Sequence, residues 1–222
     1  MNGSYVAYSE IELSPEEVLK EIGYGESLPC DETMEVILRL LDLLKHRVRP
    51  QYVYFVSTGR MEGNAITCIR NQALNTGPII SRLLDKSSSF AVFAATAGAE
   101  FEQIVQEYKQ TEDILVNYIL DIMGTAIVEK VGDRIESQLE DAFPEMLHTH
   151  RFSPGYCNWL LTEQRKIFEL LGDRPCGITL SDVCLMNPIK SISGIIGIGK
   201  EVQTSKYACR YCELKNCYKR KS

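Results

Sequence analysis

The sequence lacks any long uninterrupted run of apolar residues, and this limits where the protein works. No run approaches the roughly 20 residues that a helix needs to cross the apolar core of a bilayer. The N-terminus also lacks the basic, apolar and small-residue order of a secretory signal peptide. We therefore expect a cytoplasmic protein that does not work in a membrane.

Histidine is scarce, with three in 222 residues, and this argues against a hydrolase. No Ser-His-Asp or Cys-His order is apparent, so the sequence assigns no catalytic residue. His148 and His150 stand two apart, which on an extended segment places both side chains on one face. No Cys or acidic residue stands at a spacing that would complete a metal site with them. We interpret both as loop histidines.

Basic residues are fewer than acidic ones, and the formal net charge is -6. The charge is uneven, because residues 200–222 hold seven Lys or Arg against two Glu, about +5, which leaves about -11 for the rest. An acidic body argues against general nucleic-acid binding, while a basic tail steers an acidic partner or keeps the terminus solvated. We divide the chain into a domain of residues 1–199 and a basic tail of residues 200–222.

Disulfides are not expected, because the eight cysteines come without an export signal. Five of them are scattered singly, and most of these suit small core positions. Cys209, Cys212 and Cys217 cluster in the tail, where three thiolates could bind zinc or an iron-sulfur cluster. A closed site usually needs a fourth ligand, which could be Cys176, Cys184 or a group from a partner. The alternative is three free thiols in a basic tail.

A chain of 222 residues with 45% hydrophobic side chains can bury one sizeable core or two small ones, and local patterns predict helices and strands within one main domain. Helices are indicated by apolar residues at helical spacing and by cap residues such as Ser14, Asp31 and Thr162. The expected helices are residues 15–22, 31–44, 112–142 and 162–171, with another beginning near residue 100. The expected strands are residues 5–13, 51–57, 65–69, 90–96, 178–180 and 189–198.

Five details of these elements bear on packing. Residues 51–57 and 65–69 are expected to form a hairpin, and residues 90–96 are apolar on both faces, which is typical of a central strand. Gly124 marks a point of close packing on the long helix. Gly194, Gly197 and Gly199 mark places where strand backbone meets a neighbour or a ligand. The helix of residues 31–44 is expected to bury a stripe made of Met34, Ile37, Leu38, Leu41 and Leu44.

The only Trp, an Arg and a Ser-Pro-Gly turn fall together within residues 151–159. Proline fixes φ and glycine adopts backbone angles closed to other residues, so main chain here can approach a ligand closely. Arg151 offers a planar fork of donors for a carboxylate, and the rings of Tyr156 and Trp159 offer faces to a cation. This chemistry suits a small zwitterion. The alternative is a surface turn whose aromatic rings cover the core.

Three blocks in order carry a resemblance to a known family. Arg-Phe-Ser-Pro-Gly-Tyr at residues 151–156 precedes an amphipathic helix, then Gly-Ile-Thr-Leu at 177–180 and Ser-Ile-Ser-Gly-Ile-Ile-Gly at 191–197. This arrangement resembles the activation domain of vitamin B12-dependent methionine synthase, and more narrowly the short free-standing activation-domain proteins. The match is strongest from about residue 124 to residue 199.

The resemblance implies an α+β fold, with a twisted, mainly antiparallel sheet flanked by helices and with S-adenosylmethionine in a shallow groove. It implies reactivation of a cobalamin whose cobalt has been oxidised to the inactive Co(II) state, carried on a corrinoid-binding methyltransferase subunit. A flavodoxin- or ferredoxin-like donor supplies an electron and the sulfonium supplies a methyl group. The protein is then an accessory part of methionine synthase, and its task is to present the methyl in line with cobalt.

The resemblance also implies roles for single residues. Arg151 binds the methionine carboxylate, the backbone of Ser153 and Gly155 approaches the ligand, and Tyr156 contacts it near the cobalt-facing side. Glu129 stands at roughly the place of a Glu that contacts ligand in the family, on the helix before the Arg motif. The alternative for Glu129 is an exposed helix residue.

The chain departs from the family pattern in three ways. It lacks the modules that bind homocysteine, folate and the corrinoid, so we do not expect it to make methionine alone. It lacks an N-terminal aromatic segment with a ligand-contacting Asp, which leaves the partner of the ligand's amino group undefined. The tail cysteines are absent from the large enzymes, so the corrinoid protein served stays open. Two other functions stay open: a zinc-dependent interaction module for an acidic protein or RNA, and a noncatalytic S-adenosylmethionine sensor.

Overall fold

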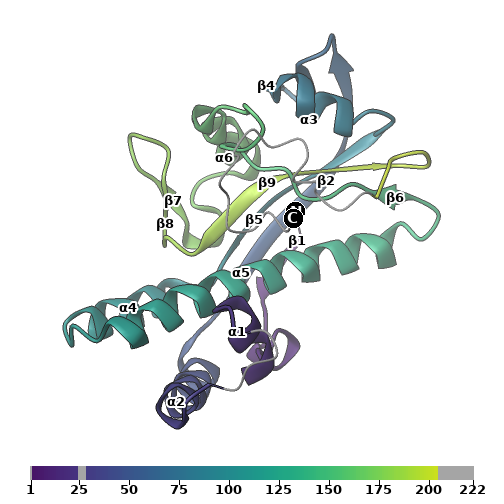
Figure 1. The fold of residues 1–222 in the computed structure, drawn as a ribbon. Coiled ribbons are helices and arrows are strands. Elements are labelled where there is room, and N and C mark those ends of the chain that lie inside the picture. The colour runs from purple at the N-terminus through teal and green to yellow at the C-terminus, as the bar shows by residue number, and fades with distance from the viewer. Residues whose placement is uncertain (1, 25–28, 205–222) are drawn as a thin grey trace.

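The structure, a computed structural model, describes residues 2–24 and 29–204, and its main feature is one sheet of seven strands (Figure 1). The strand order is β4-β3-β2-β5-β9-β6, and β1 also pairs with β2. Every pairing in this sheet is antiparallel, which confirms the expected mainly antiparallel α+β fold. A separate small hairpin pairs β7 with β8. The strands are β1 (Asn2–Tyr5), β2 (Gln51–Glu62), β3 (Ile66–Ile69), β4 (Gln72–Asn75), β5 (Ser89–Thr96), β6 (Leu147–His148), β7 (Thr179–Leu180), β8 (Met186–Asn187) and β9 (Ser191–Gly199).

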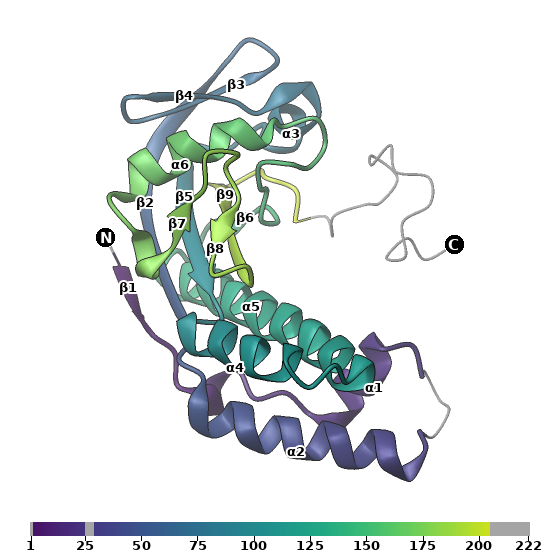
Figure 2. The same ribbon diagram turned by 90° about the vertical axis from the view of Figure 1, so that its left-hand side faces the viewer.

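Helices cover both faces of the sheet (Figure 2). One face packs against α1, α2, α4 and α5, and the other packs against α3 and α6. Among the residues that the structure describes, no helix combines the length and apolarity needed to cross a membrane. The helices are α1 (Pro15–Glu21), α2 (Asp31–Arg47), α3 (Gly77–Leu83), α4 (Ala99–Lys109), α5 (Ile114–Ala142) and α6 (Gln164–Leu171), with 3₁₀ turns at Tyr8–Glu10, Leu161–Glu163 and Pro175–Gly177.

The two layers of core follow from the alternation of side chains along the central strand β5. Ala91, Phe93 and Ala95 point toward α5 and its neighbours, whereas Phe90 and Val92 belong to the cluster under α6. Successive side chains of a strand point to opposite faces, so a strand buried on both faces must be apolar throughout. β5 lies between β2 and β9, which confirms its prediction as a central strand.

Several other local predictions are confirmed. Ser14 Oγ accepts from Glu17 N at 3.2 Å while Ser14 N donates to Glu17 Oε2 at 2.8 Å, so the capping box begins α1 as expected. The hairpin of β2 and β3 is present, although β2 runs on to Glu62 before it turns. A Cβ on Gly124 would lie 2.4 Å from the ring of Phe101, which confirms close packing between α5 and α4.

Four local predictions are wrong. The strand expected at residues 5–13 lies earlier, at Asn2–Tyr5, because only these residues pair with β2, and a 3₁₀ turn at Tyr8–Glu10 follows. Leu38 is 51% exposed, since α2 turns a face with Val36 and Leu40 toward the core in its place. Asp31 is the first residue of α2 and not its cap, since Cys30 holds the N-cap position without a side-chain hydrogen bond. Thr162 lies within a 3₁₀ turn and makes no cap hydrogen bond to α6.

Candidate functional site

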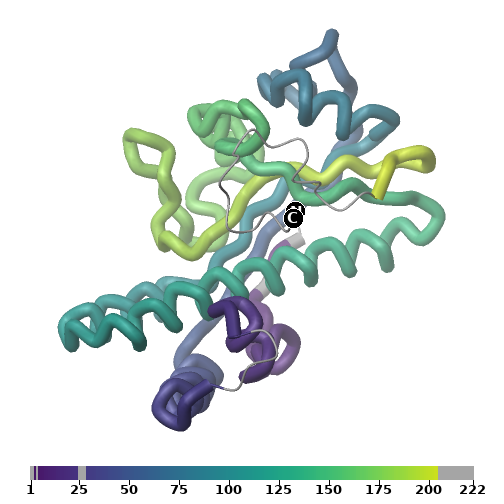
Figure 3. Tube along the Cα trace, in the orientation of Figure 1, coloured from purple at the N-terminus to yellow at the C-terminus, as the bar shows by residue number. Residues whose placement is uncertain are grey.

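The chain that follows β6 is fixed to the outer edge of β9 before it reaches the Ser-Pro-Gly turn (Figure 3). Thr149 N donates to Gly197 O at 2.9 Å, and Thr149 Oγ1 accepts from Gly197 N at 2.9 Å. Phe152 and Ile195 then exchange two backbone hydrogen bonds of 2.9 Å. A Cβ on Gly194 would lie 2.0 Å from Phe152 O, which confirms the close approach predicted there. The sheet therefore sets the position of Arg151, the residue before Phe152.

The turn itself is closed by backbone hydrogen bonds. Gly155 N donates to Trp159 O at 2.7 Å, and Trp159 N donates to Tyr156 O at 2.8 Å. Gly155, Cys157 and Asn158 have φ values of 97°, 48° and 64°, a region that costs little for glycine and more for other residues. The turn is thus ordered, as its Pro and Gly indicated, and within it Ser153 is half-buried and Gly155 is exposed.

The two aromatic rings of the turn have different surroundings. Trp159 is 1% exposed and belongs to the core cluster with Phe152 and Ile167, so the expectation that its ring faces a ligand is wrong. The alternative interpretation, an aromatic ring that covers the core, holds for this residue. Tyr156 is 59% exposed, so its ring lies at the surface beside the turn.

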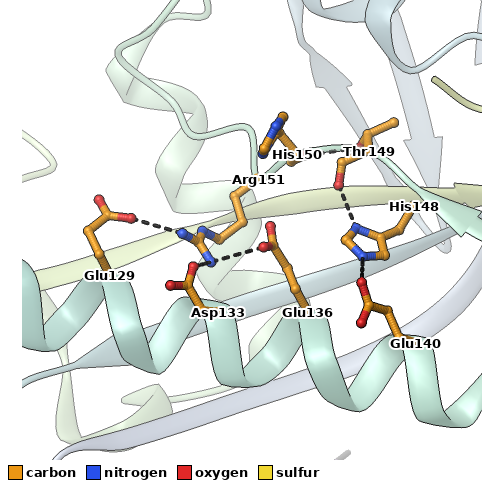
Figure 4. Close-up of polar contacts among 8 residues, drawn as sticks. All are labelled: Glu129, Asp133, Glu136, Glu140, His148, Thr149, His150 and Arg151. Carbon is orange, nitrogen blue, oxygen red and sulfur yellow. Dashed lines mark hydrogen bonds and ion pairs between the residues drawn. The ribbon is translucent and has the colours of Figure 1, made fainter. Parts of the chain in front are cut away.

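Arg151 lies across α5 and contacts three carboxylates on one face of that helix (Figure 4). Its Nη2 donates to Glu129 Oε2 at 2.9 Å, and its Nη1 donates to Asp133 Oδ1 at 2.9 Å. Nη1 also lies 3.4 Å from Glu136 Oε2. Residues at i, i+4 and i+7 share a face of a helix, so the spacing of these acids explains why one guanidinium reaches all three. The structure thereby brings the predicted residues Glu129 and Arg151 together.

Burial divides this cluster into an inner and an outer part. The side chains of Arg151 and Glu136 are each 17% exposed, whereas Glu129 and Asp133 face solvent. Burial disfavours the charge on Arg151, but the facing carboxylates outweigh it, so the pKa of the guanidinium lies above its ordinary value. Burial raises the pKa of Glu136, and its share of the single Arg151 charge offsets this only in part. Both pKa values are raised because one cation is shared among three acids: the carboxylates together outweigh the burial of Arg151, whereas Arg151 alone does not outweigh the burial of Glu136.

The surplus of carboxylates gives the site its chemical character. Three acids around one guanidinium leave a net negative charge even when Glu136 is protonated. Glu136 Oε1 has no hydrogen-bond partner among the described residues, so an acceptor is left over inside the cluster. The arrangement offers donors to a carboxylate and acceptors to a cation, which is what a zwitterion with a further positive charge requires.

His148 extends the same polar row. His148 Nε2 lies 3.1 Å from Glu140 Oε1, and its Nδ1 lies 2.9 Å from Thr149 O. His148 thus has an acidic partner one helical turn beyond Glu136, which sequence spacing did not reveal. Among the described residues no group of three or more His, Cys, Asp or Glu side chains is arranged to hold a metal ion.

The cysteines predicted to hold a metal cannot be placed against this site. Cys209, Cys212 and Cys217 lie outside the residues that the structure describes. Of the candidates for a fourth ligand, Cys184 is buried in the β7–β8 hairpin. Burial raises the pKa of the Cys176 thiol to about 12, so this thiol stays protonated at neutral pH.

A cavity of about 690 Å³ lies between α1 and α5 on the other side of Glu129. Its walls combine apolar side chains such as Leu13, Tyr118 and Ala126 with charged groups from both helices. Glu129 therefore borders both the Arg151 cluster and a hollow of the size that small ligands occupy.

Comparison with known proteins now decides the family. The model of the family described as "Vitamin B12 dependent methionine synthase, activation domain" matches residues 79–221. The chain belongs to this family. The crystal structure of the MetH reactivation domain bound to AdoHcy is similar in fold, with a TM-score of 0.66 over 93% of this chain and 80% of that chain at 15% identity. No curated protein matches.

Sequence reasoning missed three members of this activation domain's Arg151 cluster. Asp133 and Glu136 stand four and seven residues after Glu129, and that helical period was the signal that would have found them. Gly132 lies beneath the guanidinium: a Cβ there would be 2.7 Å from Arg151 Cζ. A glycine inside a helix, where alanine is more stable, was the signal for this close contact.

Proposed function

We propose that this activation domain binds S-adenosylmethionine at the Arg151 turn and supports the reductive remethylation of cobalamin on a corrinoid-binding methyltransferase subunit. The observation that carries the proposal is the position of Arg151, held between the sheet-fixed turn and the acidic face of α5. Family membership supports it, because activation domains serve a B12-dependent methyltransferase. The fold neighbour binds AdoHcy, which is S-adenosylmethionine without its transferable methyl group.

The residues present fit this ligand. Arg151 donates to the carboxylate of the ligand. Asp133 is the most exposed of the three acids, so the ligand carboxylate can most easily take the place of the Asp133 side chain on Arg151. Glu129 and the other acids face the positive charges of the ammonium and sulfonium groups. Backbone of Ser153 and Gly155 lines the turn, and the exposed Tyr156 ring lies beside it. S-adenosylmethionine carries a net positive charge, which matches the surplus of carboxylates.

The chain's own contribution is to hold and orient the ligand. When bound, the sulfonium supplies the methyl group, and a flavodoxin- or ferredoxin-like donor supplies the electron. Fixing the methyl in line with the cobalt of a docked partner removes much of the entropic barrier between two large reactants. The closed turn and its bond to β9 suit this task, because a fixed backbone cannot swing away from its partner.

Isothermal titration calorimetry with S-adenosylmethionine tests the proposal. We expect one site per chain, and weaker binding of AdoHcy, because AdoHcy lacks the sulfonium charge that the acidic face attracts. A second titration adds a corrinoid-binding methyltransferase subunit carrying cob(II)alamin. Binding of S-adenosylmethionine without any binding of the corrinoid subunit would indicate a sensor. Absence of S-adenosylmethionine binding would reject the proposal.

A further inference from the structure

Gly132 lies in the interior of α5 directly beneath Arg151, and it belongs to no motif. It is buried, and a Cβ built on it would lie 2.7 Å from both Cζ and Nη1 of Arg151 and 3.0 Å from Nε. All three atoms belong to the guanidinium group. The guanidinium therefore rests on the backbone of α5 at a point where the helix carries no side chain.

Helix formation does not explain this glycine. Glycine in a helix interior weakens a helix relative to alanine, because it has more backbone freedom to lose on folding. Close contact explains it, as it does for Gly124, where a Cβ would lie 2.4 Å from the Phe101 ring. The two glycines differ in what they contact: Gly124 meets a rigid ring in the core, and Gly132 meets the flexible end of an arginine.

The carboxylates that hold Arg151 surround this same point. Glu129 stands three residues before Gly132, Asp133 follows it directly, and Glu136 stands four residues after it. Figure 4 shows these three acids along the face of α5 that Arg151 contacts. Since positions three and four apart share a helix face, the guanidinium can meet all three carboxylates at short range only when it lies flush against the helix. A side chain at residue 132 would push it outward, away from buried Glu136 first.

We propose that Gly132 is a positioning residue for Arg151: because residue 132 has no side chain, the guanidinium can lie directly against the backbone of α5. We call this contact surface at Gly132 the seat of the guanidinium. Its role in ligand binding rests on the function proposed above; the seat itself does not. A methyl group in the seat displaces the guanidinium and leaves the fold intact, because the far end of an arginine side chain moves at little cost. The displaced guanidinium no longer presents its donor fork where a carboxylate meets it.

A double-mutant cycle without ligand tests the seat. In the Arg151→Ala background, Gly132→Ala should raise the melting temperature by roughly 1–4 °C, the gain expected when alanine replaces glycine in a helix. With Arg151 present, the same substitution should give a smaller gain or a loss, because it breaks the contacts with the carboxylates. Equal shifts in the two backgrounds would overturn the seat. The NMR signal of Arg151 Nε–H should shift in Gly132→Ala, whereas an unchanged signal would also count against displacement.

Gly124→Ala is the matched control on the same helix. It lies eight residues from Gly132, about 12 Å along the axis, and it meets Phe101 instead of Arg151. Its effect on melting should be the same with and without Arg151, since distant substitutions add. Coupling of Gly124→Ala to Arg151 as strong as that of Gly132→Ala would show a general loosening of α5 and would overturn the seat.

S-adenosylmethionine titrations separate the seat from the proposed function. If wild type binds the ligand, Gly132→Ala should bind about tenfold more weakly or worse, and should cause no further loss in Arg151→Ala. Unchanged affinity in Gly132→Ala would overturn its role in positioning for the ligand. If wild type does not bind, the proposed function fails, and the ligand-free cycle and the NMR signal still decide whether Gly132 seats Arg151.

Discussion

Arg151 offers a ligand both a positive charge and a planar fork of donors, and two single substitutions distinguish these contributions. Arg151→Ala should weaken S-adenosylmethionine binding by about 2–3 kcal/mol, or roughly thirty-fold or more, because a charge-assisted pair is lost. Arg151→Lys should recover only part of this, since an ammonium restores charge without the planar fork. Calorimetry gives both values. Arg134→Ala, on the same helix but paired with Glu10 at 3.1 Å, is the control and should bind as wild type does.

Arg151→Ala should also lower the melting temperature, because it leaves buried Glu136 without its cation. The affinities must therefore be compared at a temperature where each variant is folded. Arg151→Ala combined with Glu136→Gln should recover part of the lost stability. Wild-type affinity for S-adenosylmethionine in Arg151→Ala would mean that this residue only joins the turn to α5.

Glu136 should make stability depend on pH in a definite direction. Burial raises its pKa in the folded protein above the ordinary 4.5. Its contribution is therefore fully present below 4.5 and is lost as pH rises through the raised value. Glu136→Gln has no such loss, so its stability relative to wild type should improve from acid toward neutral pH. Denaturant unfolding at several pH values between about 4 and 7 measures this; a constant difference would contradict it.

At the scale of elements, local patterns predicted much of the fold. The capping box at Ser14, the long helix α5 and the doubly apolar β5 depend on neighbours in sequence, and all three are confirmed. The failures depend on contacts between distant segments. Burial of Trp159 requires α6 to lie over it, and the face that α2 buries, which leaves Leu38 outside, is set by the elements packed against it. The acids around Arg151 are on another element, so the turn sequence alone does not show them.

The attachment of the turn to β9 can be tested at two adjacent residues. Gly194→Ala should destabilise the protein by about 1–3 kcal/mol, because its Cβ would collide with Phe152 O and the backbone cannot yield cheaply. Ser193→Ala is the control. Its buried hydroxyl has no hydrogen-bond partner among the described residues, so its removal should be neutral or stabilising. Equal stability of the two variants would show that the turn adapts without strain.

At the scale of the whole molecule, the site joins two layers that fold around different cores. Arg151 leaves the sheet edge and crosses to α5, while Tyr156 follows on the exposed side of the turn. If the corrinoid partner docks on this side, Tyr156→Ala should weaken its binding, roughly tenfold for an interface aromatic. Tyr118→Ala, exposed on α5 beside the cavity, is the control aromatic. Equal losses in both variants would place the docking face on α5.

The cysteines of the basic tail carry a separate prediction, that they bind a metal. Cys209, Cys212 and Cys217 lie outside the described residues, and their spacing still predicts zinc or an iron-sulfur cluster. Protein purified without oxygen should contain stoichiometric metal by elemental analysis, and an iron-sulfur cluster would add visible absorption. Metal-free protein with three titratable thiols, prepared under conditions that preserve metal, would contradict the prediction.

The segment that precedes the turn covers the outer edge of β9. β6 has only two residues, yet the backbone bonds of Thr149 and Phe152 extend its cover along the outer edge of β9. An uncovered strand with apolar faces and open N–H and C=O groups is a template for adding another chain. Cleavage or displacement of this segment would therefore remove the Arg151 site and expose an aggregating edge together.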